Sequence, residues 1–376
     1  MKIIVSPDSF KGSLTASEAA KEISAGIKEI DSMIETVLLP IADGGEGTLE
    51  PLISATNGQT VYVDVHDPVG RKIHVEYGVL GDGETCVIEM AKASGLTLLK
   101  EHEKNPLIAS TYGTGEIIRH ALDNGYRKFV VGIGGSATND GGTGMLQALG
   151  MKFRNELGEE IAKGADSLKD LVEIDPQDFD TRVQESHFII ACDVDNPLIG
   201  PTGATAIFGP QKGVTPDLVE KLDQNLLNLA NRVEGLTGIS LHDQPGAGAA
   251  GGLGGAFLAF FPVELKPGID VVMEAIDFHR QIKDADFIFT GEGKSDLQTL
   301  SGKAPIGIAN AAKEQGIPVV LISGFIEQES ISQLYPYFYR LVSVADGIIS
   351  QDESIDKAAY YLRLKTKEIM KSILEK

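Results

Sequence analysis

Strand–helix alternation at both ends of this 376-residue chain, with a different pattern between them, sets the strongest limit on its fold. Residues 1–58 read as strand, helix, strand, helix, and three further strands alternate with helices from about residue 272. The predicted strands lie near residues 3–5, 35–41, 286–290, 317–322 and 340–344. Five alternating units are what a flavodoxin-like parallel sheet needs. We therefore predict an α/β fold in which residues 1–58 and 272–376 form one discontinuous domain.

Residues 59–271 follow another pattern, which predicts a second, inserted α+β domain. Residues 60–65 and 73–79 alternate apolar and polar side chains with a period of two, and Asp67-Pro68-Val69-Gly70 forms a turn between them. This alternation is typical of an antiparallel hairpin. Further predicted elements of the insert are strands near 129–135 and 187–192 and a helix that begins at Pro216.

Five of the apolar runs end at loops that combine glycine with a carboxylate. In open α/β sheets, ligands bind at the carboxyl ends of the strands. Glycine lets backbone N–H groups approach a phosphate, and carboxylates hold Mg²⁺ or accept a proton from a hydroxyl group. The pattern predicts an enzyme that handles phosphate with a metal ion. The five loops are residues 6–12, 42–47, 134–142, 192–196 and 291–296.

The formal net charge of −21 argues against nucleic-acid partners and against binding to anionic membranes. A phosphate substrate is an anion, so cations must be concentrated locally. Four lysines lie in glycine-bearing loops: Lys11, Lys212, Lys294 and Lys303. The uncharged stretch Gly246–Pro262 is shorter than the ~20 apolar residues of a membrane span. With only two cysteines and a strand at the N-terminus in place of a signal peptide, we expect a cytoplasmic protein.

The run Gly132-Ile133-Gly134-Gly135-Ser136-Ala137 follows a strand and fits the GxGxxA dinucleotide fingerprint. It leaves a dinucleotide-dependent oxidoreductase open as an alternative, and a non-catalytic nucleotide sensor as another. Asp140 follows closely, and a carboxylate repels a pyrophosphate unless a cation lies between them. The presence of Asp140 therefore favours a metal–nucleotide complex over a bare dinucleotide as the ligand of this loop. No Walker A motif is present, because Ile288 stands where Gly293-Lys294-Ser295 would need a glycine five positions earlier.

Long sequence strings add a family resemblance. The strings are SPDSFKGSL (6–14), PIADGGEGT (40–48), GIGGSATNDGGTGMLQALG (132–150), ACDVDNPLIGPTGATAIFGPQKG (191–213), GAGAAGGLGG (246–255) and GEGKSDLQTLSGKAPIGIA (291–309). Over nearly its whole length the chain resembles the bacterial glycerate kinase family, type 1. The resemblance implies transfer of the ATP γ-phosphoryl group to D-glycerate with Mg²⁺, and a flavodoxin-like domain with an inserted domain. Lys294 departs from the arginine of many relatives, and lysine binds a carboxylate less well in a two-pronged way.

Residue chemistry assigns candidate roles within these loops. The glycines and their neighbours would hold the ATP phosphates, the carboxylates would hold Mg²⁺ or serve as the base, and the lysines would bind the substrate carboxylate or the transferring phosphoryl group. The candidates are Gly134, Gly135, Ser136, Asn139 and Glu292 for the nucleotide; Asp43 and Asp140 for the metal; Asp8 or Asp193 as the base; and Lys11 and Lys303 for the substrate. The expected partner is D-glycerate, with a homodimer left open.

Overall fold

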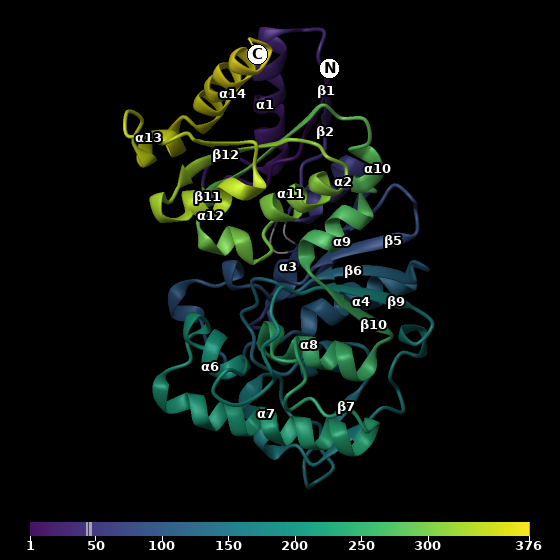
Figure 1. Ribbon diagram of the computed structural model, residues 1–376. Helices are drawn as coiled ribbons and strands as arrows, with labels where there is room; N and C mark the ends of the chain where they lie inside the picture. The colour runs from purple at the N-terminus through teal and green to yellow at the C-terminus, as the bar shows by residue number, and fades with distance from the viewer. Residues whose placement is uncertain (43, 45–46, 376) are drawn as a thin grey trace. The chain divides into compact units, whose positions relative to one another are not determined.

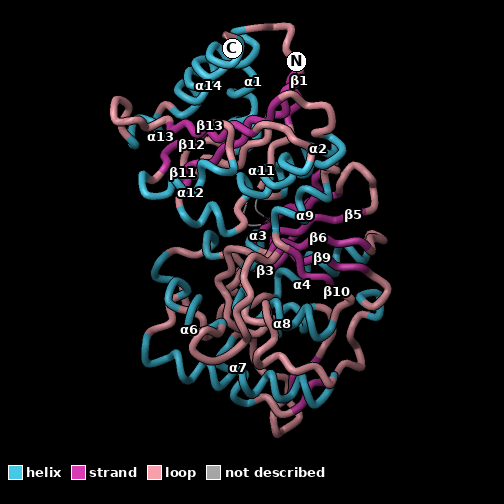
Figure 2. The backbone as a smooth tube through the Cα atoms, in the orientation of Figure 1, coloured by secondary structure: helices cyan, strands magenta, loops and turns pink. Residues whose placement is uncertain are grey.

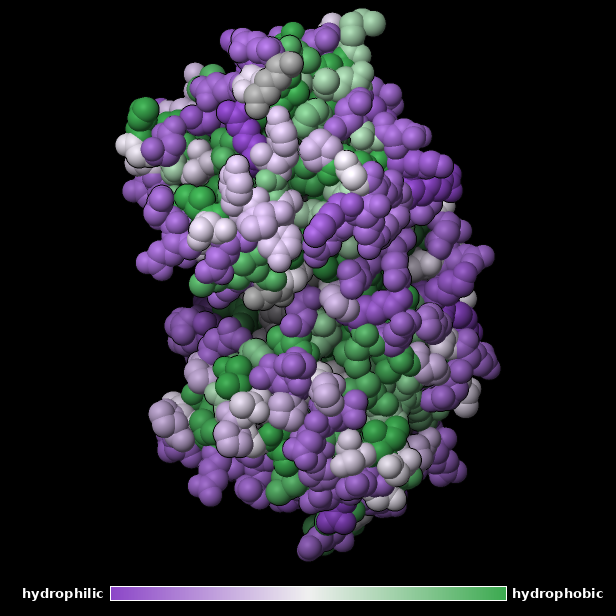
Figure 3. Space-filling model, in the orientation of Figure 1, coloured by the Kyte–Doolittle hydropathy of each residue, from purple (hydrophilic) through white to green (hydrophobic). Residues whose placement is uncertain are grey.

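The structure is a computed structural model that describes residues 1–42, 44 and 47–375. It contains two compact units. The terminal unit comprises Met1–Asp43, Glu50–Asn57 and Pro267–Lys376, and the central unit comprises Gly44–Leu49 and Gly58–Lys266. Hydrophilic side chains cover much of the visible face of each unit, with apolar ones scattered between them (Figure 3).

The terminal unit is built on a five-stranded parallel sheet (Figure 2). Its strands are β1 (Lys2–Val5), β2 (Glu35–Leu38), β11 (Phe287–Ser295), β12 (Val319–Ile326) and β13 (Arg340–Ser343). Their order is β13-β12-β11-β1-β2, and every neighbouring pair is parallel. This is the strand order of flavodoxin-like folds. The predicted five-stranded parallel sheet is therefore confirmed.

Helices pack against this sheet because their apolar residues recur at helical spacing. The first helix begins at a capping box, in which Thr15 Oγ1 accepts a hydrogen bond from Glu18 N and the Glu18 carboxylate accepts one from Thr15 N. It lies beside the last helix (Figure 1), where a Cβ atom on Gly26 would come within 2.8 Å of Thr366. The helices are α1 (Ala16–Ile30), α2 (Leu49–Thr56), α9 (Gly268–Ala275), α10 (Phe278–Gln281), α11 (Ala304–Glu314), α12 (Ile331–Leu334), α13 (Gln351–Asp356) and α14 (Ala358–Leu374).

The central unit contains a mixed six-stranded sheet in the order β10-β9-β6-β5-β4-β3. The predicted hairpin is present as β3 and β4, with Val63 opposite Val75. Strand β5 continues the antiparallel part, whereas β5, β6, β9 and β10 are parallel neighbours. The strands are β3 (Gln59–His66), β4 (Lys72–Val79), β5 (Thr85–Glu89), β6 (Lys128–Gly132), β9 (His187–Ala191) and β10 (Val263–Lys266), with a separate pair β7 (Lys152–Arg154) and β8 (Glu173–Asp175).

The core of the central unit combines many aliphatic side chains with a smaller aromatic cluster. Phe129 of β6 and Phe188 of β9 stack with ring centroids 4.5 Å apart, and both are buried.

The long helix of the central unit begins at Pro216, as predicted. The helices are α3 (Ala91–Ser94), α4 (Tyr112–Asp123), α5 (Thr143–Ala148), α6 (Ala204–Phe208), α7 (Pro216–Thr237) and α8 (Ala249–Phe260). None of the helices in the described part of the chain has both the length and the apolar composition to cross a membrane.

One predicted loop is instead part of a strand. Residues 291–295 were expected to leave the sheet, but β11 runs on to Ser295 with β12 beside it. The glycines serve close packing here: a Cβ atom on Gly291 would lie 2.1 Å from Ile322 O, and one on Gly293 would lie 2.9 Å from Lys11 N. A glycine at a tight crossing in a strand has the same sequence signature as a loop glycine.

Candidate active site

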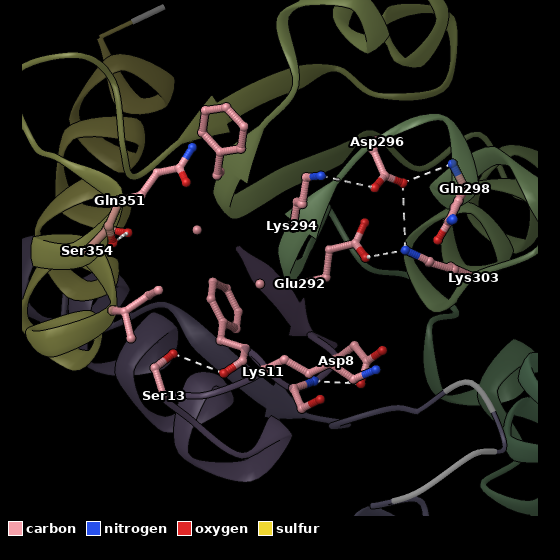
Figure 4. Close-up of a pocket in the computed structure, with 16 residues that line it drawn as sticks. Asp8, Lys11, Ser13, Glu292, Lys294, Asp296, Gln298, Lys303, Gln351 and Ser354 are labelled. Carbon is pink, nitrogen blue, oxygen red and sulfur yellow. Dashed lines mark hydrogen bonds and ion pairs between the residues drawn. The ribbon is translucent and has the colours of Figure 1, made fainter. Parts of the chain in front are cut away.

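A pocket of about 420 Å³ lies in the terminal unit, at the carboxyl ends of its strands (Figure 4). It brings together four of the predicted site residues: Asp8, Lys11, Glu292 and Lys303. Asp8 and Lys11 follow β1, Glu292 lies in β11, and Lys303 precedes α11. The parallel pairing of β1 with β11 brings the two segments together, and Asp8 N donates a hydrogen bond to Gly291 O at 2.8 Å. The two segments are more than 280 residues apart in sequence but share one site.

Glu292 is the buried carboxylate of this pocket. Its side chain is almost fully buried, and Oε1 accepts hydrogen bonds from Ser295 Oγ at 2.8 Å and Thr299 Oγ1 at 2.7 Å. Burial raises the pKa of Glu292, and these two hydrogen bonds oppose the rise. Ser295 Oγ also lies 2.7 Å from Ser323 Oγ. Since a hydroxyl group has one proton, Ser323 must be the donor in that pair when Ser295 donates to Glu292.

Lys303 lies beside two carboxylates at the edge of the pocket. Its Nζ is 3.9 Å from Glu292 Oε2 and 3.8 Å from Asp296 Oδ1, which are long ion pairs. Figure 4 shows Lys303 and Asp296 to one side of Glu292, and the segment of Asp8 and Lys11 to another. Such long pairs are weak, so Lys303 can turn toward an anionic ligand without losing a strong partner.

Lys294 is more firmly paired than Lys303. Its Nζ lies 2.6 Å from Glu327 Oε1 and 3.6 Å from Asp296 Oδ2. The hydrogen bond to Glu327 is the main reason that the pKa of Lys294 is raised. Lys11 is exposed and has no ion pair with any residue that the structure describes. Of these three pocket lysines, Lys11 is therefore the one with the most freedom to bind an anion.

Asp8 is held in a turn at the mouth of β1. Its Oδ1 accepts a hydrogen bond from Ser9 N at 2.5 Å, and its side chain is partly buried. The turn continues through a bridge between Phe10 and Leu14. A carboxylate held in this way, in the same pocket as a lysine, can accept the proton of a bound hydroxyl group.

The second glycine-rich site, here called the glycine loop, comprises residues 132–142 of the central unit. Gly134 and Gly135 are exposed, and Gly135 has a φ of +75°, which favours glycine. The tip is fixed on both sides, because Leu96 N donates to Gly135 O and Ala137 N donates to Ser94 O, both at 2.9 Å. An exposed, rigid backbone of this kind is suited to hold phosphate oxygens through N–H groups.

Asp140 lies inside the glycine loop and is completely buried. Its two oxygens accept four hydrogen bonds: from Thr111 N at 2.8 Å, Thr111 Oγ1 at 2.9 Å, Gly142 N at 3.1 Å and Gly144 N at 3.3 Å. Burial raises the pKa of Asp140, and these hydrogen bonds oppose the rise. The carboxylate ties the loop to the starts of α4 and α5, and this geometry favours a structural role over the predicted metal role.

Asn139 and Asp193 complete the predicted set in the central unit. Asn139 is fully buried and its Nδ2 donates to Thr205 Oγ1 at 2.9 Å, so its side chain faces the interior rather than a ligand. Asp193 is exposed just after β9 and does not line the pocket of the terminal unit. Asp43 lies outside the described residues.

A metal site does not follow from these side chains. Within residues 1–42, 44 and 47–375, no group of three carboxylate, histidine or cysteine side chains could hold a metal ion. Asp140 is already saturated with hydrogen-bond donors. The described side chains therefore do not form a complete set of ligands that would hold Mg²⁺ without substrate phosphates.

Some lining residues of the pocket had no usable signal in the sequence. Phe10, Phe325, Gln351 and Ser354 line it, and the last two come from α13. Only the packing of α13 in the folded chain brings Gln351 and Ser354 to the pocket. Thr299 does not line the pocket but donates a hydrogen bond to Glu292. The spacing Asp296-x-x-Thr299 before a helical turn is a capping pattern that could have indicated its role.

Comparison with known proteins gives a consistent result. The model described as "Glycerate kinase family" matches residues 3–374. A glycerate kinase from Bacillus subtilis strain 168 is 47% identical over 373 residues, 99% of this chain and 98% of its own length. A glycerate 2-kinase from Escherichia coli K12 is 46% identical over 88% of this chain and 86% of its own length. A crystal structure assigned to a glycerate kinase 2 from Salmonella typhimurium LT2 matches with a TM-score of 0.90 and 42% identity, covering 100% of this chain and 98% of the other.

Proposed function

This chain belongs to the glycerate kinase family, and we propose that it transfers the γ-phosphoryl group of ATP to a hydroxyl group of D-glycerate. The observation that carries the proposal is the pocket in which Asp8, Lys11, Glu292 and Lys303 meet. It offers cations for an anionic hydroxy acid and carboxylates beside them. Phosphoryl transfer needs mainly positioning and charge neutralisation, which such a pocket supplies.

Each proposed role follows from the contacts of the residue. Lys11 has no ion pair with a described residue, so it binds the glycerate carboxylate or the transferring phosphoryl group. Lys303, which lies beside Glu292 and Asp296, assists in binding this anion. Asp8 accepts the proton of the attacking hydroxyl group, with Asp193 as the alternative base. Glu292 holds Thr299 and Ser295 in place through its hydrogen bonds, which makes it a positioning residue of the pocket.

The glycine loop is the proposed cradle for the ATP phosphates. Gly134 and Gly135 present backbone groups at the surface, and Ser136, which is largely buried, follows them with a hydroxyl group. Magnesium remains part of the proposal as a companion of ATP, since Mg²⁺ usually binds substrate phosphates with few protein ligands. No step of the reaction is assigned to it, because no group of three metal-ligating side chains occurs among the described residues.

The family match gives no support to the two alternatives, a dinucleotide-dependent oxidoreductase or a nucleotide sensor without catalysis. We further expect a cytoplasmic location and neither nucleic-acid nor membrane partners. Light scattering during size-exclusion chromatography tests whether the protein forms a homodimer.

An ADP-release assay over a panel of small hydroxy acids tests the proposed activity. We expect turnover with D-glycerate, ATP and Mg²⁺, and ³¹P NMR of the product then identifies which hydroxyl group is phosphorylated. Glycolate and L-lactate are matched controls that keep the carboxylate but offer fewer hydroxyl groups. The proposal fails if D-glycerate supports no ADP release while another acceptor does.

A further inference from the structure

Lys212 is a buried cation below the glycine loop. It ends the short 3₁₀ helix Pro210–Lys212, and only 1% of its surface is exposed. Lysine is almost never fully buried without a function for its charge or a partner for it. No carboxylate of the described residues forms an ion pair with Lys212, so its partners are neutral oxygens.

Two short hydrogen bonds fix the ammonium group. Lys212 Nζ donates to Ser136 Oγ at 2.7 Å and to Thr138 O at 2.7 Å. Both acceptors belong to the glycine loop, directly after the exposed tip of Gly134 and Gly135. The charge of Asp140 favours the protonated lysine, although burial has the larger effect and lowers the pKa of Lys212 to about 7.

The direction of the hydrogen bond to Ser136 has a chemical consequence. An ammonium group can only donate, so Ser136 Oγ must accept from Lys212. The single proton of the Ser136 hydroxyl group is then left to donate in another direction. No described residue accepts a hydrogen bond from it, while the neighbouring backbone at Gly134 and Gly135 is open to a ligand.

We propose that Lys212 is a positioning residue that holds the Ser136 hydroxyl group as a hydrogen-bond donor toward the phosphate groups of ATP. Lys212 does not touch the nucleotide. It acts from below the loop, where its charge also attracts the anion through a medium that screens less than water. The inference rests on the proposed function, in which this loop binds the ATP phosphates.

A double-mutant cycle tests this inference. Hydrogen bonds to charged groups contribute enough that Ser136→Ala should raise the KM for ATP about tenfold, with little change in the KM for D-glycerate. Lys212→Met should raise the KM for ATP at least as much. In the Ser136→Ala background Lys212→Met should add much less, because the hydroxyl group that it positions is gone. Lys212→Arg, which keeps the charge, should recover part of the loss.

Lys221→Met is the matched control, since Lys221 is a partly exposed lysine of the same unit that pairs with Asp166. It should leave both KM values within about twofold of wild type. Circular dichroism and thermal unfolding show whether each variant folds. If Lys212→Met does not fold, Lys212→Arg, which keeps the charge but changes the geometry of the donor, takes its place in the cycle with Ser136→Ala.

An unchanged KM for ATP in folded Ser136→Ala or folded Lys212→Met overturns the inference, as do fully additive effects in the cycle. Calorimetric titration of ATP on the same variants separates this inference from the proposed function. If wild-type protein binds ATP but does not phosphorylate D-glycerate, the proposed function fails while the ATP affinities still test the role of Lys212.

Discussion

The pocket of the terminal unit and the glycine loop of the central unit place their charges in opposite ways. In the pocket, Lys11 and Lys294 are exposed and Lys303 is partly exposed. At the glycine loop, Asp140 of the loop and Lys212 below it are buried, and backbone groups of Gly134 and Gly135 are exposed. The same residue types therefore serve two purposes: direct contact with a ligand in one region, and support of a backbone surface in the other.

The largest effect is expected at Lys11. Lys11→Met should lower the turnover of D-glycerate by about 10² to 10³-fold, because a charge that stabilises the transition state is lost. Thermal stability should change little, since the side chain is exposed and has no ion pair with a described residue. Steady-state kinetics and a melting curve check this. Lys28→Met, at an exposed lysine of α1, is the control, and Lys11→Met turnover within about twofold of the control would contradict direct contact.

Asp140→Asn should act mainly on stability. An amide has only one acceptor oxygen, and its NH₂ group would face N–H donors that now bind Asp140. Leaving such buried donors unsatisfied should lower the free energy of unfolding by about 1–3 kcal/mol. Urea unfolding measures it, with Asp243→Asn at an exposed aspartate as control. Unchanged stability with a large loss of Mg²⁺-dependent activity would instead restore the metal role.

Glu292→Gln should change the pH dependence of stability. The pKa of Glu292 is raised by burial, so between its unfolded and folded values the native state binds the proton more firmly than the unfolded chain does. The protonated carboxyl group stabilises the native state fully at pH values below the pKa of Glu292 in the unfolded chain. This stabilisation is lost as the pH rises through the pKa of Glu292 in the folded protein. The unfolding free energy of wild type relative to Glu292→Gln should therefore fall as pH rises above about 4.5.

Urea unfolding at several pH values measures this difference, and Glu329→Gln, at an exposed glutamate of the same unit, should show no such trend. A buried glutamate titrates within the range from about pH 4 to about pH 8. If the difference in unfolding free energy between wild type and Glu292→Gln stays constant over this range, burial does not raise the pKa of Glu292.

The smallest effect is expected for Lys294→Arg. A guanidinium group binds carboxylates in a two-pronged way, so the KM for D-glycerate should fall by about two- to fivefold if position 294 contacts the substrate. Glu327 and Asp296 already engage Lys294, which limits the gain. Substrate-saturation kinetics measure the change, and an unaltered KM would mean that Lys294 serves its ion pairs with Glu327 and Asp296 and does not contact the substrate.

Several features of the fold could be predicted because they depend on local sequence patterns. The five parallel strands, the β3–β4 hairpin, the Thr15–Glu18 capping box and the start of α7 at Pro216 follow from hydrophobic periodicity and capping chemistry. The length of β11 could not, since Gly291 and Gly293 have the composition of a loop while their neighbours require them inside a strand.

The sequence by itself determined which residues carry charge and where the strands lie along the chain, and thus which segments next to them could form a site. Only the tertiary structure decided that Asp8, Lys11, Glu292 and Lys303 share one pocket, because segments near both ends of the chain meet in one sheet. Only the tertiary structure decided that Asp140 and Lys212 are buried. Burial depends on packing between segments far apart in the chain, and burial is what turns a charged side chain from a ligand contact into a support for the backbone.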